Sequence, residues 1–151
     1  MSQSLSKIYV HLTFGTKFRQ PFITEDIEEE LHSVMAGIFK KCNSPALIIN
    51  SVPDHTHVLF RMSKNHALSA IVRRFKTNSS KWIKVRSIGH QDFRWQVGYG
   101  AFSVSSSGVE VVRKYIAKQK EHHKVISYKE EIELFIKKYD LIEYNSEYYW
   151  D

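Results

Sequence analysis

The order of the sequence segments predicts an α+β fold in which α-helices cover an antiparallel β-sheet. Segments that alternate apolar and polar residues, as half-buried strands do, are interspersed with segments whose apolar residues recur at helical spacing. Two strand segments follow one another across a short turn, which indicates antiparallel pairing. The chain has 151 residues, of which 42% are hydrophobic, so we expect a single domain over residues 1–151 that buries its own core.

The N-terminal part is expected to form three strands and one helix. Residues 7–16 alternate as a strand does. Thr24 precedes an acidic first turn and apolar residues at helical spacing, so we expect it to cap a helix. Residues 46–52 and 55–62 are expected to pair as a hairpin around the turn at residues 53–54.

The remaining elements follow from the same signals. A helix is expected to begin near Asn65 and to break near residues 78–80, and residues 93–105 again have strand character. The next helix is expected over about residues 109–124, and Ser127 with Glu130 matches a capping box for another. The tail is too aromatic for a disordered end, so we expect these residues to dock on the body or on a partner: Tyr144, Tyr148, Tyr149 and Trp150.

Cysteine content and hydropathy favour a cytoplasmic protein. Cys42 is the single cysteine, so an internal disulfide is excluded. The N-terminus lacks the apolar run of a signal peptide, and no segment has the uninterrupted apolar length that a bilayer span requires.

Positive charge is concentrated in the middle of the chain. The formal net charge is +6, and residues 55–91 contain no acidic residue. This distribution suits a polyanion such as a nucleic acid, although a solvated helix surface explains it equally well. The cations of this segment are Arg61, Lys64, Arg73, Arg74, Lys76, Lys81, Lys84 and Arg86.

Two histidines of one predicted strand are candidates for metal binding. His55 and His57 are two residues apart, so both side chains project from one face of the strand, and Thr56 points to the other. Arg61 shares the face of the histidines and could hold a phosphate beside the metal. A His-x-His pair also occurs in unrelated hydrolases and as a structural feature, so the pair alone leaves its role open.

The predicted helix at residues 109–124 supplies further candidates. Tyr115 and Gln119 are four residues apart and therefore lie on one helix face. Their basic neighbours favour an approaching phosphate: Arg113, Lys114, Lys118 and Lys120. Alternatively, Tyr115 is a residue at the boundary of an amphipathic helix. Three nearby residues are either further ligands or part of a solvated helix end: Glu121, His122 and His123.

Three ordered blocks resemble a known family. They are Asp-His-Thr-His-Val-Leu-Phe at 54–60, Trp-Gln-Val-Gly-Tyr-Gly-Ala-Phe-Ser-Val-Ser at 95–105, and Tyr-Ile-Ala-Lys-Gln-Lys-Glu-His-His-Lys at 115–124. Together they resemble the single-tyrosine HUH transposases of the insertion-sequence-200-like family, over nearly the whole chain. Thr56 departs from the bulky apolar residue usual at the centre of the HUH motif, but it faces away from the expected metal.

The resemblance implies a fold, an activity and a set of site residues. The fold is the ferredoxin-like or RRM-like core of HUH nucleases. His55, His57 and Gln119 would bind a divalent cation, and Tyr115 would be the nucleophile. The substrate would be single-stranded DNA with hairpins at the element ends, cleaved and rejoined through a 5′-phosphotyrosine intermediate.

The resemblance also bears on the metal and on assembly. Imidazole ligands alone would suggest zinc, whereas the phosphate substrate and the family favour Mg²⁺ or Mn²⁺. The family further implies a homodimer in which His55 and His57 of one subunit work with Tyr115 of the partner subunit. The flexible segment at residues 105–108 would permit this exchange.

Cations and one aromatic residue are the expected DNA contacts. Cations would bind phosphates, and the Trp82 indole would stack on an unpaired base or belong to the core instead. The candidates are Arg61, Arg73, Arg74, Lys76, Lys81, Trp82 and Lys118.

Two other functions compete with this prediction. One is a non-catalytic, domesticated protein that recognises hairpins without cutting them. The other is a histidine phosphodiesterase that acts on RNA ends, although such enzymes use two separated His-x-Ser/Thr motifs and only one obvious histidine motif is present here.

Overall fold

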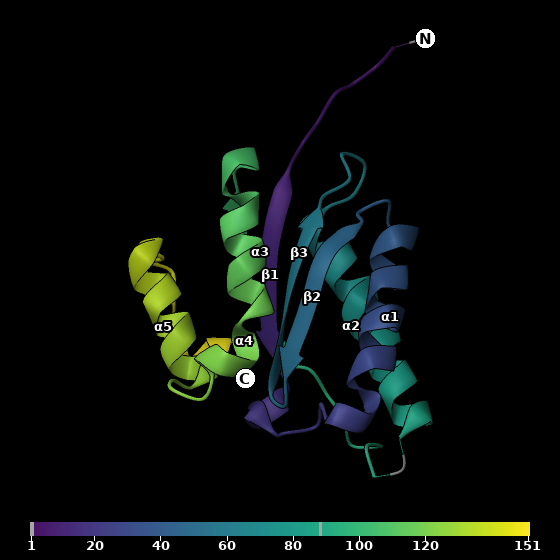
Figure 1. The fold of residues 1–151 in the computed structure, drawn as a ribbon, viewed down its shortest axis with the longest axis vertical. Coiled ribbons are helices and arrows are strands. Elements are labelled where there is room, and N and C mark those ends of the chain that lie inside the picture. The colour runs from purple at the N-terminus through teal and green to yellow at the C-terminus, as the bar shows by residue number, and fades with distance from the viewer. Residues whose placement is uncertain (1, 88) are drawn as a thin grey trace.

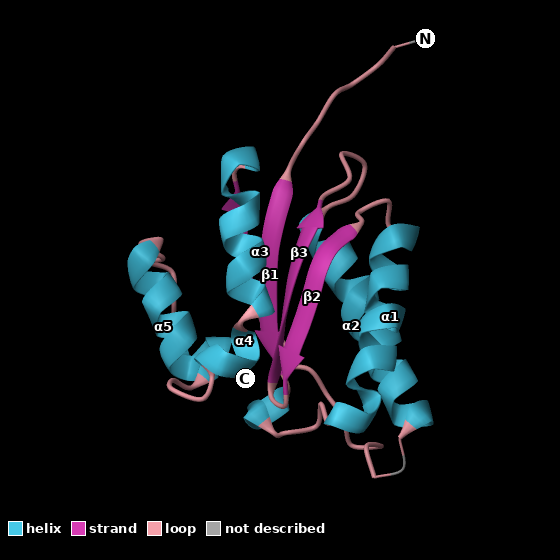
Figure 2. Ribbon diagram, in the orientation of Figure 1, coloured by secondary structure: helices cyan, strands magenta, loops and turns pink. Residues whose placement is uncertain are grey.

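A computed structural model describes residues 2–87 and 89–151. Its centre is a four-stranded sheet in the order β2-β3-β1-β4, with all neighbouring strands antiparallel. Figure 2 shows these strands between two groups of helices, which confirms the predicted α+β fold. The strands are β1 (Tyr9–Gly15), β2 (Ala46–Val52), β3 (His55–Arg61) and β4 (Gly100–Val104).

Helices lie on both sides of the sheet (Figure 1). The first group is α1 (Glu25–Lys41) and α2 (Leu68–Arg86), which pack on each other. The second group is α3 (Val109–Ala117), α4 (Gln119–His122) and α5 (Tyr128–Lys138). Short helical turns complete the chain: η1 (Lys17–Arg19), η2 (Ser106–Gly108) and α6 (Ser146–Tyr149). None of these described helices has the length and apolar character needed to cross a membrane.

The main core lies between the sheet and the pair α1 and α2. Leu12 and Phe14 of β1 and Val58 and Phe60 of β3 project into it and are fully buried. Because side chains alternate along a strand, the intervening residues of β1 and β3 project toward α3, α4 and α5. The core therefore fixes which strand residues are available for a site on the opposite face.

The α2 helix differs from the expectation at its start and its middle. It begins at Leu68, not near Asn65, and continues unbroken to Arg86. The hydroxyl of Ser79, where a break was expected, donates to the Phe75 carbonyl at 2.6 Å and accepts from the Trp95 indole at 3.0 Å. Since Ser79 satisfies its polar group on the helix itself, it has no need to disrupt the helix.

Only the end of the predicted strand at residues 93–105 is strand. Trp95 forms an isolated bridge with Thr16, and β4 begins at Gly100. Between them, the Lys76 ammonium of α2 donates to three successive carbonyls, those of Gln96, Val97 and Gly98, at 2.7 to 2.9 Å. Carbonyls that point toward a lysine are not available to a sheet ladder.

The expected helix at residues 109–124 is divided. It is helical up to Ala117, changes direction at Lys118 with φ −95° and ψ 13°, and resumes as α4. The following helix has the predicted capping box, in which the Ser127 hydroxyl accepts from the Glu130 N–H. The segment at residues 105–108 is ordered as the turn η2.

The aromatic tail docks on the body, as expected. Gln96 donates its side-chain amide to the Tyr149 carbonyl at 2.7 Å, and the Val97 N–H donates to the Asp151 carbonyl at 3.1 Å. The Trp150 ring meets Tyr128 edge to face, with 5.6 Å between centroids. Tyr128 in turn stacks on His55 of β3, so the tail packs against a residue that contacts the candidate site.

Candidate active site

The histidine pair lies on the sheet face opposite the main core. His55 and His57 project together from β3 and are fully buried under α3, α4 and α5, which confirms that they share a face. Thr56 points to the other side, where its hydroxyl accepts from Ser51 at 3.1 Å. The strand period therefore places the two imidazoles as the sequence predicts.

A glycine makes room for the ring that covers His55. Gly15 of β1 lies opposite His55 in the strand register. A Cβ at this position would lie 3.1 Å from the Tyr128 ring and from the Gln96 side-chain oxygen, closer than side chains normally approach. Tyr128 stacks on His55, with 3.9 Å between centroids and 10° between ring planes. The missing side chain of Gly15 thus permits this stack.

A glutamate from α5 connects the candidate residues. Glu131 is 1% exposed, and its Oε1 lies 3.0 Å from Nε2 of His57 and 3.1 Å from Nε2 of His123. Its Oε2 accepts hydrogen bonds from the Tyr115 hydroxyl and from the Gln119 amide, the latter at 3.0 Å. One carboxylate therefore contacts both the nucleophile candidate and the metal-ligand candidates.

Gln119 directs its amide oxygen at two imidazoles. The oxygen lies 3.3 Å from Nε2 of His55 and 2.8 Å from Nε2 of His123. Gln119 is fully buried, because the change of direction at Lys118 turns α4 toward the sheet. The amide group is thus oriented with its oxygen toward the histidines and its nitrogen toward Glu131.

The donor set fits a divalent cation. His55, His57, His123 and Glu131 each offer one ligand atom, and these atoms all lie within 4.8 Å of one another. Two ligands at roughly 2.1 Å from one ion are at most about 4.2 Å apart, so a contraction of a few tenths of an ångström closes the site. Sequence reasoning missed Glu131, and it placed His123 in a solvated helix end as the simpler alternative.

Further hydrogen bonds orient the histidine rings. Nδ1 of His55 lies 2.8 Å from the Asp54 carboxylate, and Nδ1 of His57 lies 2.8 Å from Nε2 of His11. Each bond engages the ring nitrogen that faces away from Glu131. Contacts of this kind set the tautomer of a metal-binding histidine, leaving Nε2 for the ion.

The electrostatics favour neutral His55 and His11 and an ionised Glu131. Burial lowers the pKa of His55 to about 4 and that of His11 to about 3. Burial also disfavours ionised Glu131, but hydrogen bonds from His123 and His57 outweigh it and hold the Glu131 pKa far below its usual range. Burial disfavours charged His123 too, yet the bond to Glu131 and its negative charge raise the His123 pKa.

Tyr115 is held protonated in this arrangement. Burial, followed by the charge and the hydrogen bond of Glu131, raises the Tyr115 pKa far above its usual range. The phenol hydrogen is thus directed at the carboxylate that would receive it. A positive charge close to Glu131 would weaken this effect.

The described chain brings Tyr115 to its own histidines. Asn50 of β2 donates to the Ile116 carbonyl at 2.8 Å, and Arg113 donates to the Leu47 carbonyl at 3.0 Å, which fastens α3 to the sheet. The rings of His57 and Tyr115 are 6.1 Å apart between centroids. A site shared between subunits would require these α3 contacts to form with the partner subunit.

Two expected DNA contacts have other partners in the structure. Arg61 lies six residues from His55 along β3, roughly 20 Å away, and donates to the Ser6 carbonyl at 2.9 Å. The expectation that it holds a phosphate beside the metal is therefore wrong. The ammonium of Lys76 is occupied by its three carbonyls, so its role here is to hold the segment before β4.

The remaining DNA candidates fall into two places. Lys118 is exposed at the junction of α3 and α4, between Tyr115 and Gln119 in sequence. The others belong to α2, which lies across the sheet from Tyr115. Arg73 is exposed on this helix. A groove between α2 and α1 is lined by Arg74, Lys81 and Trp82. Trp82 is half-buried and packs against the core, which agrees with the expectation that it belongs to the core and not with base stacking.

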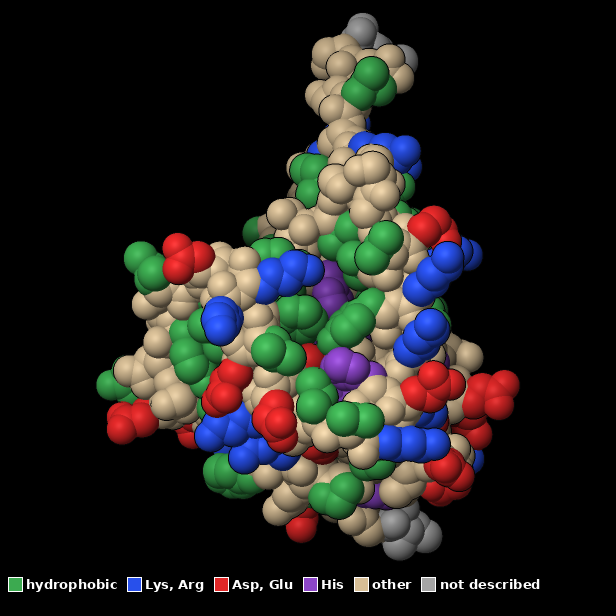
Figure 3. All heavy atoms as spheres, turned by 60° about the vertical axis from the view of Figure 1, so that its left-hand side comes forward, with side chains coloured by type: hydrophobic (Ala, Val, Ile, Leu, Met, Phe, Trp, Pro, Cys, Tyr) green, Lys and Arg blue, Asp and Glu red, His purple; other side chains and the backbone are tan. Residues whose placement is uncertain are grey.

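The surface over the site is apolar at its centre and carries charged side chains of both signs around it. Figure 3 shows histidine side chains near the middle of this face, surrounded by hydrophobic groups, with Lys and Arg side chains on either side. Such a surface offers cations for phosphates and apolar groups for bases.

Comparison with known proteins identifies the family. A family model described as "Transposase IS200 like" matches residues 4–119, which is more than half of the chain and includes His55, His57, Tyr115 and Gln119. The chain belongs to the IS200-like transposase family. The resemblance derived from the three sequence blocks is thereby confirmed. A search among curated proteins gives no match.

Solved structures show that other proteins share the fold of this IS200-like transposase. A Deinococcus radiodurans R1 protein, whose own assignment as a transposase is provisional, has a TM-score of 0.61 and 19% identity, with 79% of this chain and 98% of that chain covered. A REP-associated tyrosine transposase bound to a REP hairpin has a TM-score of 0.60 and 14% identity, with 83% and 76% covered.

Proposed function

We propose that this IS200-like transposase cleaves and rejoins single-stranded DNA at hairpins through a 5′-phosphotyrosine on Tyr115. The observation that supports this most is the shared carboxylate of Glu131, which contacts the Tyr115 hydroxyl and, on its other oxygen, His57 and His123. The nucleophile is thus adjacent to a set of metal ligands. One structural neighbour is a tyrosine transposase bound to a hairpin, which favours the same class of substrate here.

The chemistry requires one bond to form and one to break. The Tyr115 oxygen attacks the phosphorus and the bond to the DNA 3′-oxygen breaks. The 3′-oxygen leaves with the bonding electrons and takes up one proton to become a hydroxyl, which balances the proton that Tyr115 loses. Glu131 already accepts the hydrogen bond of the phenol and is placed to receive its proton. Attack of a 3′-hydroxyl on the phosphotyrosine reverses these steps, returns the proton to Tyr115 and joins strands without an external energy source.

His55, His57 and Gln119, with His123 and Glu131, would hold the divalent cation. A bound cation would offset the negative charge that grows on the phosphate oxygens in the transition state. Oxygen ligands from Glu131, Gln119 and the phosphate suit Mg²⁺ or Mn²⁺, which we propose as the metal, whereas the imidazoles also suit zinc. Because the contact with Glu131 raises the pKa of His123, metal binding at this imidazole would release a proton.

A denaturing gel tests the proposed function directly. Protein is incubated with Mn²⁺ and a single-stranded hairpin DNA that carries a label on the 3′ side of the cleaved phosphate. Cleavage through Tyr115 leaves this label on the protein, so a covalent band appears. A non-catalytic hairpin-binding protein would give no band and no cut strand. A phosphodiesterase would cut RNA ends without forming an adduct.

Binding is expected to depend on salt and on Lys118. Affinity for a single-stranded hairpin should exceed that for blunt duplex of the same sequence and should fall steeply with salt. Replacing Lys118 with alanine should lower the slope of log affinity against log salt by about 0.7, the value for one phosphate contact on a single strand. Fluorescence anisotropy at several salt concentrations measures both effects.

The matched control is Lys40→Ala, which removes an exposed cation from the end of α1 on the far side of the sheet. Its slope should equal that of the wild type. Equal affinities for hairpin and duplex would instead indicate a regulator that binds double-stranded DNA.

We also propose, from the family resemblance, that the active complex is a homodimer with crossed sites. Mixing Tyr115→Phe protein with His57→Ala protein should then restore cleavage to about a quarter of the wild-type level, because half of the dimers are mixed and each has one intact site. The adduct should lie on the His57→Ala chain only. A differently tagged copy of each variant allows the gel to show which chain carries the DNA.

Active sites formed within one chain would give the opposite result in this mixing experiment. If each chain uses its own histidines, as the contacts of α3 with its own β2 would give, every site in the mixture lacks a component. No recovery after verified subunit exchange would therefore refute the crossed arrangement and leave the tyrosine chemistry intact.

A further inference from the structure

An asparagine of β2 lies beside the candidate active site and has no part in the proposed chemistry. Asn50 is half-buried and lies opposite His57 in the antiparallel register of β2 and β3. Side chains of directly opposed residues point to the same face of a sheet, so Asn50 and His57 both face α3 and α4. The side chain of Asn50 therefore reaches the segment that carries Tyr115 and Gln119.

The amide group of Asn50 caps the end of α3. Its NH₂ group donates to the carbonyl of Ile116 at 2.8 Å and to that of Ala117 at 3.4 Å, the last two residues of the helix. The last carbonyls of a helix lack a partner within it, and a side-chain donor can satisfy them. Because Lys118 follows directly, the Asn50 amide is bonded to the chain where α3 ends and the direction changes.

The oxygen of the same amide holds the beginning of α4. It accepts from the Lys120 ammonium at 3.0 Å and from the neighbouring Ser51 N–H at 2.9 Å. Lys120 directly follows Gln119 in the sequence. In the same way, Ile116 directly follows Tyr115. One amide on β2 is thus bonded to the residue after the nucleophile candidate and to the residue after a metal-ligand candidate.

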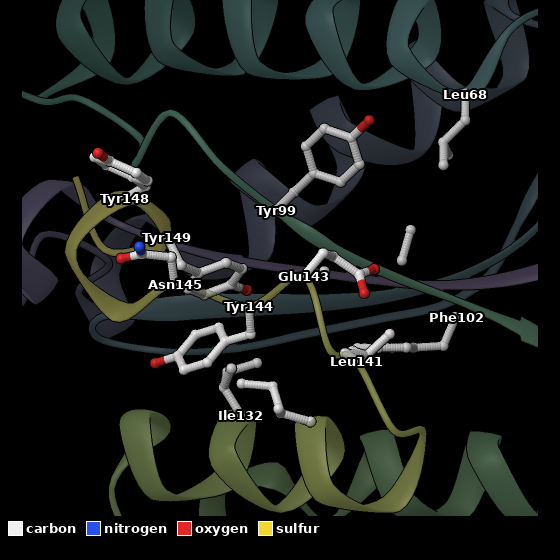
Figure 4. A pocket seen from close by; sticks show the side chains of 13 residues that line it. Leu68, Tyr99, Phe102, Ile132, Leu141, Glu143, Tyr144, Asn145, Tyr148 and Tyr149 are labelled. Carbon is white, nitrogen blue, oxygen red and sulfur yellow. The ribbon is translucent and has the colours of Figure 1, made fainter.

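The other side of the site, toward β4, is packed less completely. A cavity of about 480 Å³, open to the solvent, lies there between β4 and α5 (Figure 4). Phe102 of β4 and Ile132 of α5 are among the residues that line it. An unfilled space supplies no contacts to the groups around it. The placement of Tyr115 and Gln119 therefore depends more on the hydrogen bonds from β2.

We infer that Asn50 is a positioning residue that sets Tyr115 and Gln119 against the metal ligands of β3. The inference rests on the proposed function for the roles of these residues, and it adds a side chain that touches neither the substrate nor the metal. A misplacement of about 1 Å can lower a rate by about 100-fold, so a residue that fixes both helix ends can have a large effect from outside the site. In a homodimer with crossed sites, the same bonds would join Asn50 of one subunit to α3 of the partner subunit.

Two substitutions of Asn50 test this assignment. Asn50→Ala removes the donor and the acceptor, so the initial rate of adduct formation at saturating Mn²⁺ should fall by about 100-fold. Its affinity for the hairpin should stay at the wild-type level. In calorimetric titration without DNA, its affinity for Mn²⁺ should fall by about 10-fold, because Gln119 is no longer held toward the histidines. Asn50→Asp keeps the shape but turns an oxygen toward the carbonyls of α3, so its adduct rate should fall as far.

Ser51→Ala is the matched control. Ser51 is the next residue of β2, but its hydroxyl bonds to His32 and Thr56 on the other face of the sheet. Thermal unfolding should show that Ser51→Ala is less stable than the wild type, whereas its adduct rate and its Mn²⁺ affinity should be unchanged. Equal losses in Ser51→Ala and Asn50→Ala would overturn the inference, because they would reflect general destabilisation. A wild-type adduct rate in Asn50→Asp would overturn it as well.

The two proposals fail in distinguishable ways. If the wild-type protein forms the covalent adduct and Asn50→Ala forms it at the same rate, the positioning role fails and the tyrosine chemistry stands. If no adduct ever forms but Asn50→Ala lowers the Mn²⁺ affinity and Ser51→Ala does not, the proposed cleavage fails and Asn50 still positions Gln119.

Discussion

Replacing Tyr115 with phenylalanine is expected to abolish the covalent protein–DNA adduct while binding of the hairpin stays nearly unchanged. The variant loses only the hydroxyl that bonds to Glu131, and the phenyl ring still packs near His57 and Phe135. Removal of the nucleophilic atom leaves no other route to the phosphotyrosine, so adduct formation should fall by at least about a thousand-fold. The denaturing gel measures the adduct, and anisotropy measures binding.

Tyr139→Phe is the matched control. Tyr139 follows α5 directly, is 41% exposed and stacks on Phe102, so the same change removes a hydroxyl outside the metal-ligand cluster. Adduct yield should stay at the wild-type level. A Tyr115→Phe protein that still forms the adduct at normal yield would show that another residue is the nucleophile.

Loss of a histidine of β3 is expected to have the second largest effect. His57→Ala should lower the affinity for Mn²⁺ by more than about 100-fold, since it removes one imidazole ligand and disturbs the bonds of Glu131 and His11. His55→Ala should act similarly. Gln119→Ala should weaken binding less, because a neutral amide oxygen is the poorest ligand of the set. Calorimetric titration with Mn²⁺ measures these affinities without DNA or turnover.

The Glu131→Gln variant tests whether the negative charge of Glu131, and not only the size of its side chain, is needed for metal binding. It keeps the size of the side chain but removes the anionic ligand, so Mn²⁺ affinity should fall by about 10- to 100-fold. Alanine is avoided here because the buried partners of Glu131 would lose their acceptor. His32→Ala is the control, because His32 is a half-buried histidine that bonds to Ser51 on the other face of the sheet. Unchanged Mn²⁺ binding in the β3 variants would mean that the histidine pair is structural.

Several features of the site could be predicted from the sequence because they depend on local geometry. A strand period of two puts His55 and His57 on one face. Tyr115 and Gln119 do reach one acceptor, as expected, but across the break at Lys118 and not along one continuous helix. Three motif blocks in order were sufficient to identify the family, which the family model confirms. The sheet, its hairpin and the docked tail were predicted for the same local reasons.

Other features were missed because their partners are distant in the sequence. Ser79 satisfies its hydroxyl within α2 and on Trp95, so a residue that often disrupts helices does not do so here. Lys76 was expected to be free for DNA, yet it binds the carbonyls of the segment before β4. Arg61 shares a strand face with the histidines but lies at the far end of that strand.

By itself, the sequence determined the α+β fold, the family, the common face of His55 and His57 and the spacing of Tyr115 and Gln119. Only the tertiary structure decided that Glu131, from a helix 74 residues beyond His57, supplies the carboxylate that connects them. Local periodicity fixes the direction of a side chain relative to its own strand or helix. Which distant charge that side chain meets depends on how α5 packs over the sheet, and this packing follows from the burial of apolar groups along the whole chain.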